Sequence, residues 1–443
     1  MAQTELSPES QAVVRNYLWI SGLFWLSASV IWGVNTLFLL DAGLTLFQTF
    51  IANAAWTAGM VVFEVPTGLV ADTLGRRVSY LLSASVLALG TFGYVAISWV
   101  GGGLMPFVLV SVVLGLAYTF YSGAVEAWMV DALRSTGYRG DLDPIFARGG
   151  VVTGAAMLVG TVSGGLLGML DLSLPYLARV ALLLGSFGVA FVGMRDVGFT
   201  PRALHIRDLP REVGSVARAS WEHGWRRRSV RLLMMVSLVQ FSVGAWAFYA
   251  WQPYFLDLLG RPDAIWVAGV VAALIALASI IGNTLVGKIL RPGIHRSTFL
   301  ITGGLAYAAS LAVVGMTSSF FIAAGVYLAG VLIGAMARPV KQAYLHEVIP
   351  TEQRATVVSF DALFGSFGSV GGQMGLGYLA QERSIATGFM VSGGIAFLAL
   401  PFLFALRLLG EPADRIRSPE PPEADVGAEV VATEGGRAEG APR

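Results

Sequence analysis

Twelve long apolar stretches divide this chain, and each is long enough to cross a bilayer as a helix. A helical span takes about 20 apolar residues, and lipid admits only helices or closed barrels because every backbone polar group needs an internal partner. The stretches do not alternate as barrel strands do. The sequence therefore predicts an all-α membrane protein whose twelve spans are Tyr17–Leu40, Phe47–Val70, Val78–Ser98, Leu104–Leu133, Phe146–Leu170, Leu174–Met194, Val230–Leu258, Ala264–Ile289, Thr298–Met316, Phe320–Val348, Thr356–Gln381 and Ile385–Leu409.

The composition excludes several classes of protein. Hydrophobic residues make up 55% of the chain and charged residues 13%, whereas soluble domains carry about 25% charged residues. There is no cysteine, and the four histidines show no metal-ligand spacing, so we predict no disulfide, thiol nucleophile or metal site. Glycine clusters lie inside apolar stretches, which excludes nucleotide-binding fingerprints. We expect neither an enzyme nor a nucleic-acid-binding protein.

A basic segment separates the spans into two groups of six. We predict a cytoplasmic N-terminus (residues 1–16), an N-terminal six-helix bundle (17–194), a cytoplasmic basic middle loop (195–229), a C-terminal six-helix bundle (230–409) and a disordered cytoplasmic tail (410–443). The middle loop is interpreted either as an amphipathic helix near anionic headgroups or as a solvated connector.

Lysine and arginine gather at alternate connections between the spans. The connection after the second span holds Arg76 and Arg77, whereas the connections on the opposite side hold only Arg261 and Arg383. By the positive-inside rule, the basic connections and both termini are cytoplasmic. We expect a multi-pass protein of the plasma (inner) membrane.

The connection between the second and third spans reads "GLVADTLGRR" and resembles the loop signature of the major facilitator superfamily. Gly68, Asp72, Gly75, Arg76 and Arg77 match that pattern, and the loop has the same place among twelve helices. The resemblance extends over the whole arrangement of spans. It implies two six-helix halves that open alternately to the two sides of the membrane, and it says little about the substrate.

The resemblance also implies a cytoplasmic latch between the halves. In the family, the loop aspartate faces the start of the eleventh helix, and the first arginine reaches an acid that ends the fourth. In this sequence, Asp72 would face the helix that starts near Thr356, and Arg76 would reach Asp131. The two glycines are expected to permit a tight turn and close backbone approach. The predicted latch residues are Gly68, Asp72, Gly75, Arg76, Arg77 and Asp131.

One stretch of the fifth span bears on the direction of transport. "GTVSGG", Gly160 to Gly165, resembles the glycine signature of family exporters with Thr161 in place of the proline. Generic helix packing explains the small residues equally well. Ser111 stands where many drug exporters carry an arginine. The prediction is proton-coupled export (antiport) of small amphipathic organic compounds, and the alternatives are proton-coupled metabolite uptake or lipid or glycolipid flipping.

Acids inside the predicted spans are candidates for proton coupling, because a charge in lipid is costly. They are Glu126 in the fourth span, Glu64 in the second and Asp361 in the eleventh. Helical spacing places Glu126 on one small, polar face with Tyr118 and Ser122. A structural ion pair is the alternative for Glu64 and Asp361.

The tenth span carries the corresponding basic face. Glu126 is predicted to pair with Arg338 or Lys341 across the pathway, and the alternative is a local pair with Arg134 or Arg148. Aromatic and amide side chains elsewhere are interpreted either as a cavity wall for amphipathic molecules or as packing. The predicted cavity residues are Asn35, Tyr118, Ser122, Gln240, Tyr249, Gln252, Arg338, Lys341 and Gln342.

We expect a monomer that is driven by the proton gradient and needs no cofactor. Its expected partners are a small organic substrate, protons and the lipid bilayer.

Overall fold

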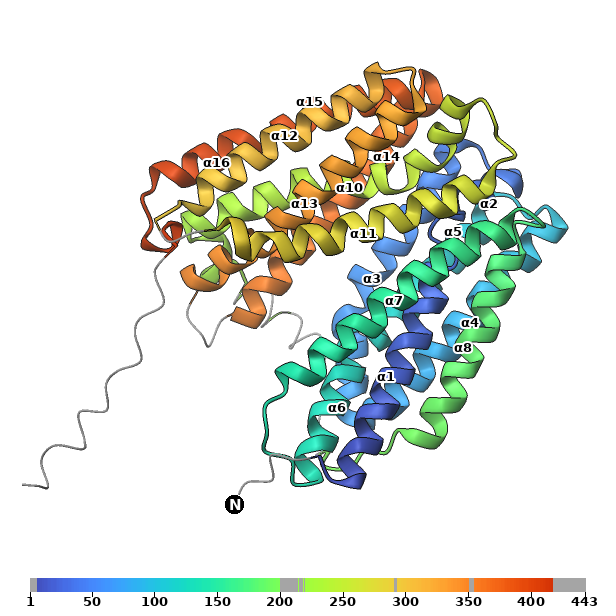
Figure 1. The fold of residues 1–443 in the computed structure, drawn as a ribbon, viewed down its shortest axis with the longest axis vertical. Coiled ribbons are helices and arrows are strands. Elements are labelled where there is room, and N and C mark those ends of the chain that lie inside the picture. The colour runs from blue at the N-terminus through green and yellow to red at the C-terminus, as the bar shows by residue number, and fades with distance from the viewer. Residues whose placement is uncertain are drawn as a thin grey trace, which may run out of the picture.

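The computed structural model describes residues 6–199, 214, 218, 220–290, 293–349 and 354–416 of the 443-residue chain. Helices are the regular elements of these residues, beside one isolated β-bridge between His295 and Arg415 (Figure 1). Most of the predicted middle loop lies outside the described residues. So do residues 417–443 of the predicted tail.

The N-terminal half contains eight helices that account for the first six predicted spans. They are α1 (Pro8–Ser29), α2 (Asn35–Asp41), α3 (Leu46–Leu74), α4 (Arg76–Val100), α5 (Leu104–Tyr121), α6 (Ala124–Ser135), α7 (Asp143–Gly168) and α8 (Leu174–Gly193).

The C-terminal half repeats the pattern after a short π-helix, η2 (Ser220–Trp225). Its helices are α10 (Arg228–Leu259), α11 (Ile265–Ile289), α12 (Arg296–Met316), α13 (Phe320–Val348), α14 (Arg354–Glu382), α15 (Ile385–Phe397), α16 (Ala399–Leu408) and the 3-10 turn η4 (Pro412–Asp414). In the described residues, ten helices are long and apolar enough to cross a membrane when α5–α6 and α15–α16 are each taken as one. The pair α1–α2 and α14 occupy the other two predicted spans.

The first span differs from the predicted Tyr17–Leu40. Its helix already begins at Pro8, because Ser7 caps it by accepting a hydrogen bond from the Ser10 N–H and proline suits a first helical position. Residues 30–34 then form turns between α1 and α2. An apolar run in the sequence shows which residues lie in lipid. It does not show that the helix begins earlier in polar residues, or that the helix is interrupted at residues 30–34.

The fourth span is not the continuous helix predicted over Leu104–Leu133. It breaks between α5 and α6 at Ser122, and Gly123 has a left-handed backbone with φ of 73°. Glycine adopts this conformation without a Cβ clash. The face predicted to join Tyr118, Ser122 and Glu126 along one helix is therefore interrupted, which corrects that expectation.

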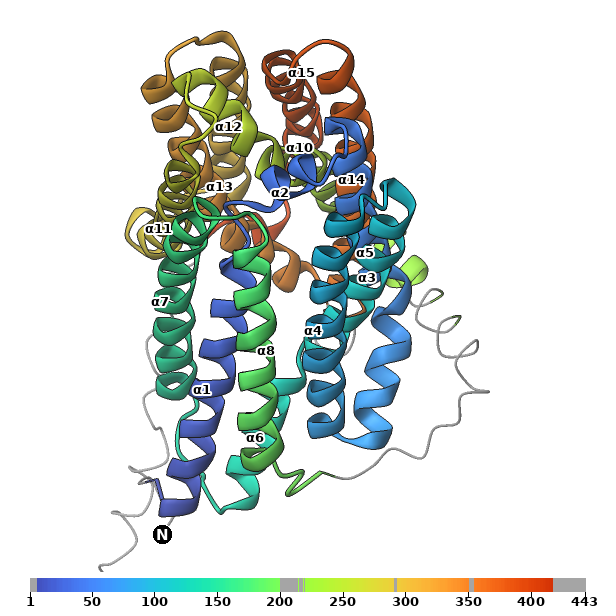
Figure 2. The same cartoon turned by 90° about the vertical axis from the view of Figure 1, so that its right-hand side faces the viewer.

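We call the end of the molecule that carries the start of α1, the α3–α4 turn and the start of α10 the basic end. The opposite end carries α2, the start of α3 and the end of α10. One apolar core lies within the N-terminal half and one within the C-terminal half, and a third joins Phe50 of α3 to residues of the C-terminal half. The halves meet where α7 lies against α11 and α3 against α14 (Figure 2).

Close backbone approach marks the crossing of α7 and α11. A Cβ added to Gly165 would lie 2.6 Å from the Gly269 Cα, so neither position has room for a side chain. Small residues let membrane helices pack at this distance. The glycine-rich stretch of the fifth span is thus used in packing between the halves.

The first residues of the predicted tail are ordered rather than disordered. Asp414 is 2% exposed and accepts hydrogen bonds from the Ser297 N–H and hydroxyl at the start of α12. Arg407 forms an ion pair with Asp414 at 3.0 Å. Arg296 binds both Glu347 and the Ala413 carbonyl. These bonds fasten η4 across α12 and α13.

Candidate functional site

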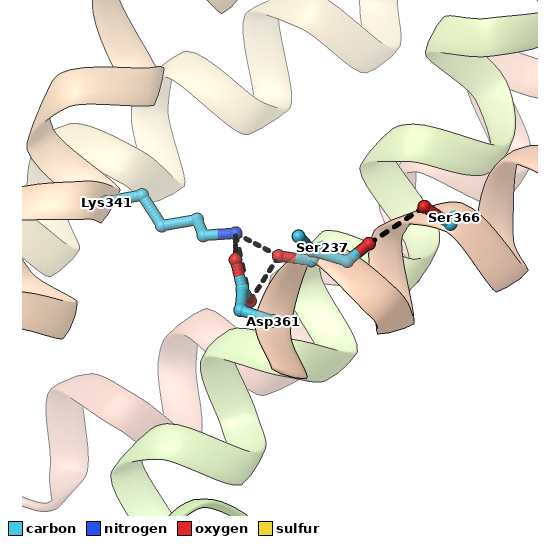
Figure 3. Close-up of polar contacts among 5 residues, drawn as sticks. Ser237, Lys341, Asp361 and Ser366 are labelled. Atoms are coloured by element: carbon cyan, nitrogen blue, oxygen red, sulfur yellow. Dashed lines mark hydrogen bonds and ion pairs between the residues drawn. The ribbon is translucent and has the colours of Figure 1, made fainter. Parts of the chain in front are cut away.

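A largely buried ion pair and one serine join three helices of the C-terminal half. The Lys341 Nζ on α13 lies 2.9 Å from the Asp361 Oδ2 on α14 (Figure 3). Ser237 on α10 donates a hydrogen bond to the Asp361 Oδ1 at 2.6 Å and also contacts the Lys341 ammonium. The side chains of Lys341 and Asp361 are only 12% and 14% exposed. We call these three residues the Lys341–Asp361 cluster.

The electrostatics of this cluster set what it can do. Either charge alone would be costly within the membrane, and pairing offsets that cost. A proton on Asp361 would remove its attraction for Lys341 and leave the ammonium without a counter-charge. The ion pair therefore holds the two opposite charges of α13 and α14 together.

Glu126 does not make the predicted pair across the pathway. Lys341 is bound to Asp361 in its own half, and Arg338 is exposed. Glu126 is exposed in the first turn of α6 and, among the described residues, forms no ion pair, so the local alternatives with Arg134 and Arg148 are also unformed. Lys341 is held by Asp361 in the other half, and Glu126 lies in the first turn of a separate helix after the break at Gly123.

Glu64 lies exposed on α3. The Tyr118 ring packs against Phe24 and Trp56. Of the three predicted coupling acids, Asp361 alone has a cationic partner in the described part of the chain.

The latch residues lie together at the basic end, but their contacts differ from those of the family pattern. The Arg76 guanidinium pairs with Asp72 one turn earlier, at 2.9 Å, and not with Asp131. No hydrogen bond or ion pair in the described residues joins either side chain to α14. In this conformation the loop is fastened within its own half.

Gly75 and Arg77 hold the α3–α4 turn against the end of α8. The Arg77 N–H donates to the Asp196 Oδ1 at 3.0 Å, and the Arg77 Nη2 donates to the Phe191 carbonyl at 2.8 Å. Gly75 has φ of 101°, and an added Cβ would overlap the Asp196 carboxylate. Asp196 therefore occupies the helix N-terminus, a place favourable for an anion. Gly68, by contrast, lies inside α3 with no close neighbour, so no turn forms there.

The predicted cavity residues have different fates. Gln252 is fully buried, and both ends of its amide bind the backbone of the α1–α2 connection. Asn35 donates a hydrogen bond to the Tyr176 hydroxyl at 3.1 Å. Gln240 and Tyr249 are partly buried on α10. Ser122, Arg338 and Gln342 are exposed.

Sequence reasoning missed Arg179, a basic residue inside α8. Its Nε is buried and has no hydrogen-bond partner, and among the described residues no carboxylate lies within ion-pair distance. The signal was present, because Arg179 interrupts the sixth apolar stretch. The argument applied to intramembrane acids applies equally to this cation.

Comparisons with known proteins agree with this architecture. A family model described as Major Facilitator Superfamily matches residues 294–435. No curated protein sequence matches the chain.

Several solved transporter structures share the fold across nearly the whole chain. The nucleoside transporter NupG has a TM-score of 0.73 at 11% identity, with 90% of this chain and 99% of that chain covered. The D-xylose-proton symporter has a TM-score of 0.63 at 14% sequence identity, with 90% of this chain and 97% of that chain covered. A third structure is a bacterial homologue of the human lysosomal transporter Spinster in an inward-facing and occupied conformation. Its TM-score is 0.66 at 15% sequence identity, with 94% of this chain and 100% of that chain covered. The predicted fold class, an all-α membrane protein of the major facilitator type, is confirmed.

Proposed function

We propose that this multi-pass membrane protein is a secondary transporter of the major facilitator superfamily and moves small organic solutes by alternating access. The comparisons support transport in general rather than an enzyme activity, and they do not identify a substrate or a direction. The geometry that carries the proposal is the one-sided junction between the two halves.

Every hydrogen bond between the halves in the described residues lies at the opposite end. Thr36 binds Gln252 and the Tyr249 carbonyl, and the Phe47 N–H donates to Gln381. Ring contacts between the halves, such as Phe50 with Trp246, lie there too. At the basic end, the end of α3 and the start of α14 make no such bond. In this state the two halves are bonded to each other at the opposite end and make no hydrogen bond to each other at the basic end among the described residues. Alternating access requires such a state and its reverse.

Proton coupling is assigned first to the Lys341–Asp361 cluster. Among the predicted coupling acids in the described residues, Asp361 is the one paired with a cation, Lys341. Its helix, α14, packs against α3 of the other half. Protonation at Asp361 would therefore change the contacts of a helix that reaches across the molecule. Glu126 and Glu64 are the remaining candidates, and the same assay ranks all three.

The direction proposed is export from the side of the basic end, which the distribution of lysine and arginine makes cytoplasmic. The packing of Gly165 on Gly269 accounts for the glycine stretch without reference to direction, so the assay must decide it. Uptake driven by protons is the alternative outcome. Lipid flipping is tested in the same vesicles with a fluorescent phospholipid.

The test of alternating access uses a crosslink at the opposite end. Because the chain has no cysteine, Phe47→Cys and Gln381→Cys can be combined and joined with a short, reducible thiol reagent. Proteoliposomes holding the full chain are given a mixture of amphipathic compounds and a pH gradient, and internal compounds are measured by mass spectrometry. We expect crosslinking to stop movement and reduction to restore it, with each single-cysteine variant as control. Equal transport by the crosslinked protein would contradict the proposal.

The test of coupling compares Asp361→Asn with Asp263→Asn, whose side chain is 74% exposed in a surface pair. Asp361→Asn should lose accumulation driven by the pH gradient and keep exchange at equal pH, whereas the control keeps both. Undiminished accumulation by folded Asp361→Asn would move the assignment to Glu126 or Glu64, which are then changed to Gln in turn.

A further inference from the structure

The surroundings of Arg179 contain neutral tyrosine hydroxyl groups. Arg179 lies one turn after Tyr176 on α8, and the ring of Tyr176 lies 6.1 Å from that of Tyr94 on α4. Tyr249 on α10 is joined to this group through α2, because Asn35 binds Tyr176 and Thr36 binds the Tyr249 carbonyl. The Tyr94 hydroxyl is already bonded to Ser111 at 2.5 Å. Tyr176 accepts a hydrogen bond from Asn35, which leaves its own proton to donate. Tyr249 has no side-chain hydrogen bond among the described residues.

This arrangement lacks a negative charge, and the Asn35 Oδ1 beside Tyr176 is a buried, neutral acceptor without a partner. The guanidinium of Arg179 offers only donors, and the free protons of Tyr176 and Tyr249 add two more. A cation in a membrane-spanning helix is costly without a counter-charge, and here no acidic residue of the described chain supplies one. The group that would complete the site is an anion with two or more acceptor oxygens, which matches the fork of an arginine.

The site also lies between the two halves. Arg179 and Tyr176 belong to the N-terminal half, whereas Tyr249 belongs to α10 of the C-terminal half. Thr36, the residue after Asn35, binds the Tyr249 carbonyl at 2.9 Å, so α2 and α10 are in direct contact here. An occupant of the site would therefore touch both halves, as a transported solute must.

A row of aromatic rings continues from the site. Tyr249 packs edge-on against Phe248 with ring centroids 5.1 Å apart, and Phe248 packs against Trp32 at 6.1 Å. Trp32 in turn contacts Trp25 at 6.1 Å. All four rings are partly rather than fully buried. They form an apolar wall beside the donors, suited to the carbon skeleton of an amphipathic molecule.

We propose that Arg179, with Tyr176 and Tyr249, binds the carboxylate of a small organic anion whose apolar part lies along Phe248, Trp32 and Trp25. This inference rests on the proposed transport function and narrows its substrate class from organic solutes to organic anions. The rival explanation is a structural arginine that reaches the headgroup region, and the compound panel and variants below separate the two.

The experiment measures thermal stabilisation of the purified full chain by matched compounds. Each of a panel of alkyl and aryl carboxylates, 3-phenylpropionate among them, is compared with its own amide and amine. The carboxylates should raise the melting temperature in a saturable way, and the amides and amines should not. If no carboxylate stabilises the protein, or if the amides act equally, the inference is wrong. Stabilisation confined to added phosphatidylglycerol would also overturn it.

Variants locate the effect. Arg179→Gln should weaken carboxylate binding by about tenfold or more, and Arg179→Lys by less because it keeps the charge but loses the fork. Tyr249→Phe, which deletes one donor, should weaken it several-fold. Arg383→Gln, an exposed arginine at the same end, is the control that should leave binding unchanged. If Arg179→Gln does not fold, Tyr249→Phe and Arg179→Lys carry the test, and unchanged affinity in both would contradict the site.

Failure of this inference is distinguishable from failure of the transport proposal. Carboxylate binding that depends on Arg179, without movement of any compound into proteoliposomes, supports the site and rejects transport. Movement of neutral compounds that is unaffected in Arg179→Gln supports transport and rejects the site.

Discussion

The side chain of Gln252 accepts a hydrogen bond from the backbone N–H of Thr36 at 2.8 Å, across the boundary between the two halves. Its other end donates to the Trp32 carbonyl at 2.9 Å. These two backbone groups flank the interruption between α1 and α2, where helical hydrogen bonds are missing. One buried amide from α10 thus replaces them.

Replacing Gln252 by Leu should loosen the opposite end. The N–H of Thr36 and the carbonyl of Trp32 would be left buried and unpaired, at a cost of about 1–3 kcal/mol each when no water reaches them. Amide hydrogen exchange at residues 30–36 should rise, and thermal stability in detergent should fall. Gln240→Leu is the matched control, since Gln240 lies on the same helix without a side-chain hydrogen bond among the described residues. Equal exchange in the two variants would refute the role given to Gln252.

The Lys341–Asp361 pair should behave as a coupled unit in unfolding. Removing one partner leaves a largely buried charge, and we expect Asp361→Asn or Lys341→Met to lower the free energy of unfolding by about 3–5 kcal/mol. The double variant should recover much of that loss. A double-mutant cycle in detergent measures the coupling. The exposed Arg261–Asp263 pair serves as control and should couple by no more than about 1 kcal/mol. Additive losses at Lys341 and Asp361 would show that the pair is not a unit.

Two glycines of the loop motif should respond oppositely to alanine. Gly75→Ala forces a left-handed backbone and overlaps Asp196, so we expect a loss of stability of about 1–3 kcal/mol. Gly68→Ala, inside α3 with free space around it, should be neutral or stabilising by up to about 1 kcal/mol. Chemical unfolding measures both. If Gly68→Ala nevertheless slows transport, position 68 matters in a state with the basic end closed, as the latch predicts. Normal transport in that variant would remove Gly68 from the latch.

The turn after α16 should contribute to the stability of the C-terminal half. Asp414→Asn weakens the cap on α12 and the ion pair with Arg407, which is partly exposed, so a loss of about 1–2 kcal/mol is expected. Glu411→Gln, a neighbouring acid without a side-chain bond in the described residues, is the control. Thermal unfolding followed by tryptophan fluorescence compares them. Identical melting temperatures for the two variants would mean that the turn merely rests on the bundle.

Much of the fold could be predicted because lipid imposes a simple rule on sequence. Any run of about 20 apolar residues reads as a span, and the small residues of the fifth span indicate close helix packing. The breaks at residues 30–34 and at Gly123 stay hidden, since they lie within apolar runs. What stabilises the first break is a glutamine more than two hundred residues away, and no local pattern reveals it.

The site was harder to predict because pairing is a three-dimensional property. Charge inside an apolar stretch singled out Lys341 and Asp361, but the analogy between the two halves matched Lys341 with Glu126. Lys341 and Asp361 lie on consecutive helices of the same half, so Lys341 pairs with Asp361 and not with Glu126 of the other half. Arg179 shows the opposite failure, because a lone cation offers no pattern to match.

The contact between Gly165 and Gly269 has a mechanical consequence. At this point the two helices touch through bare backbone, so a change in their crossing angle there displaces no side chain. From Gly165 to the start of α7 at Asp143 the helix forms a rigid arm about 33 Å long. Tilting it by about 10° around the glycine contact would carry its far end through roughly 6 Å, so a small adjustment at the fulcrum becomes a displacement the size of a side chain at the basic end.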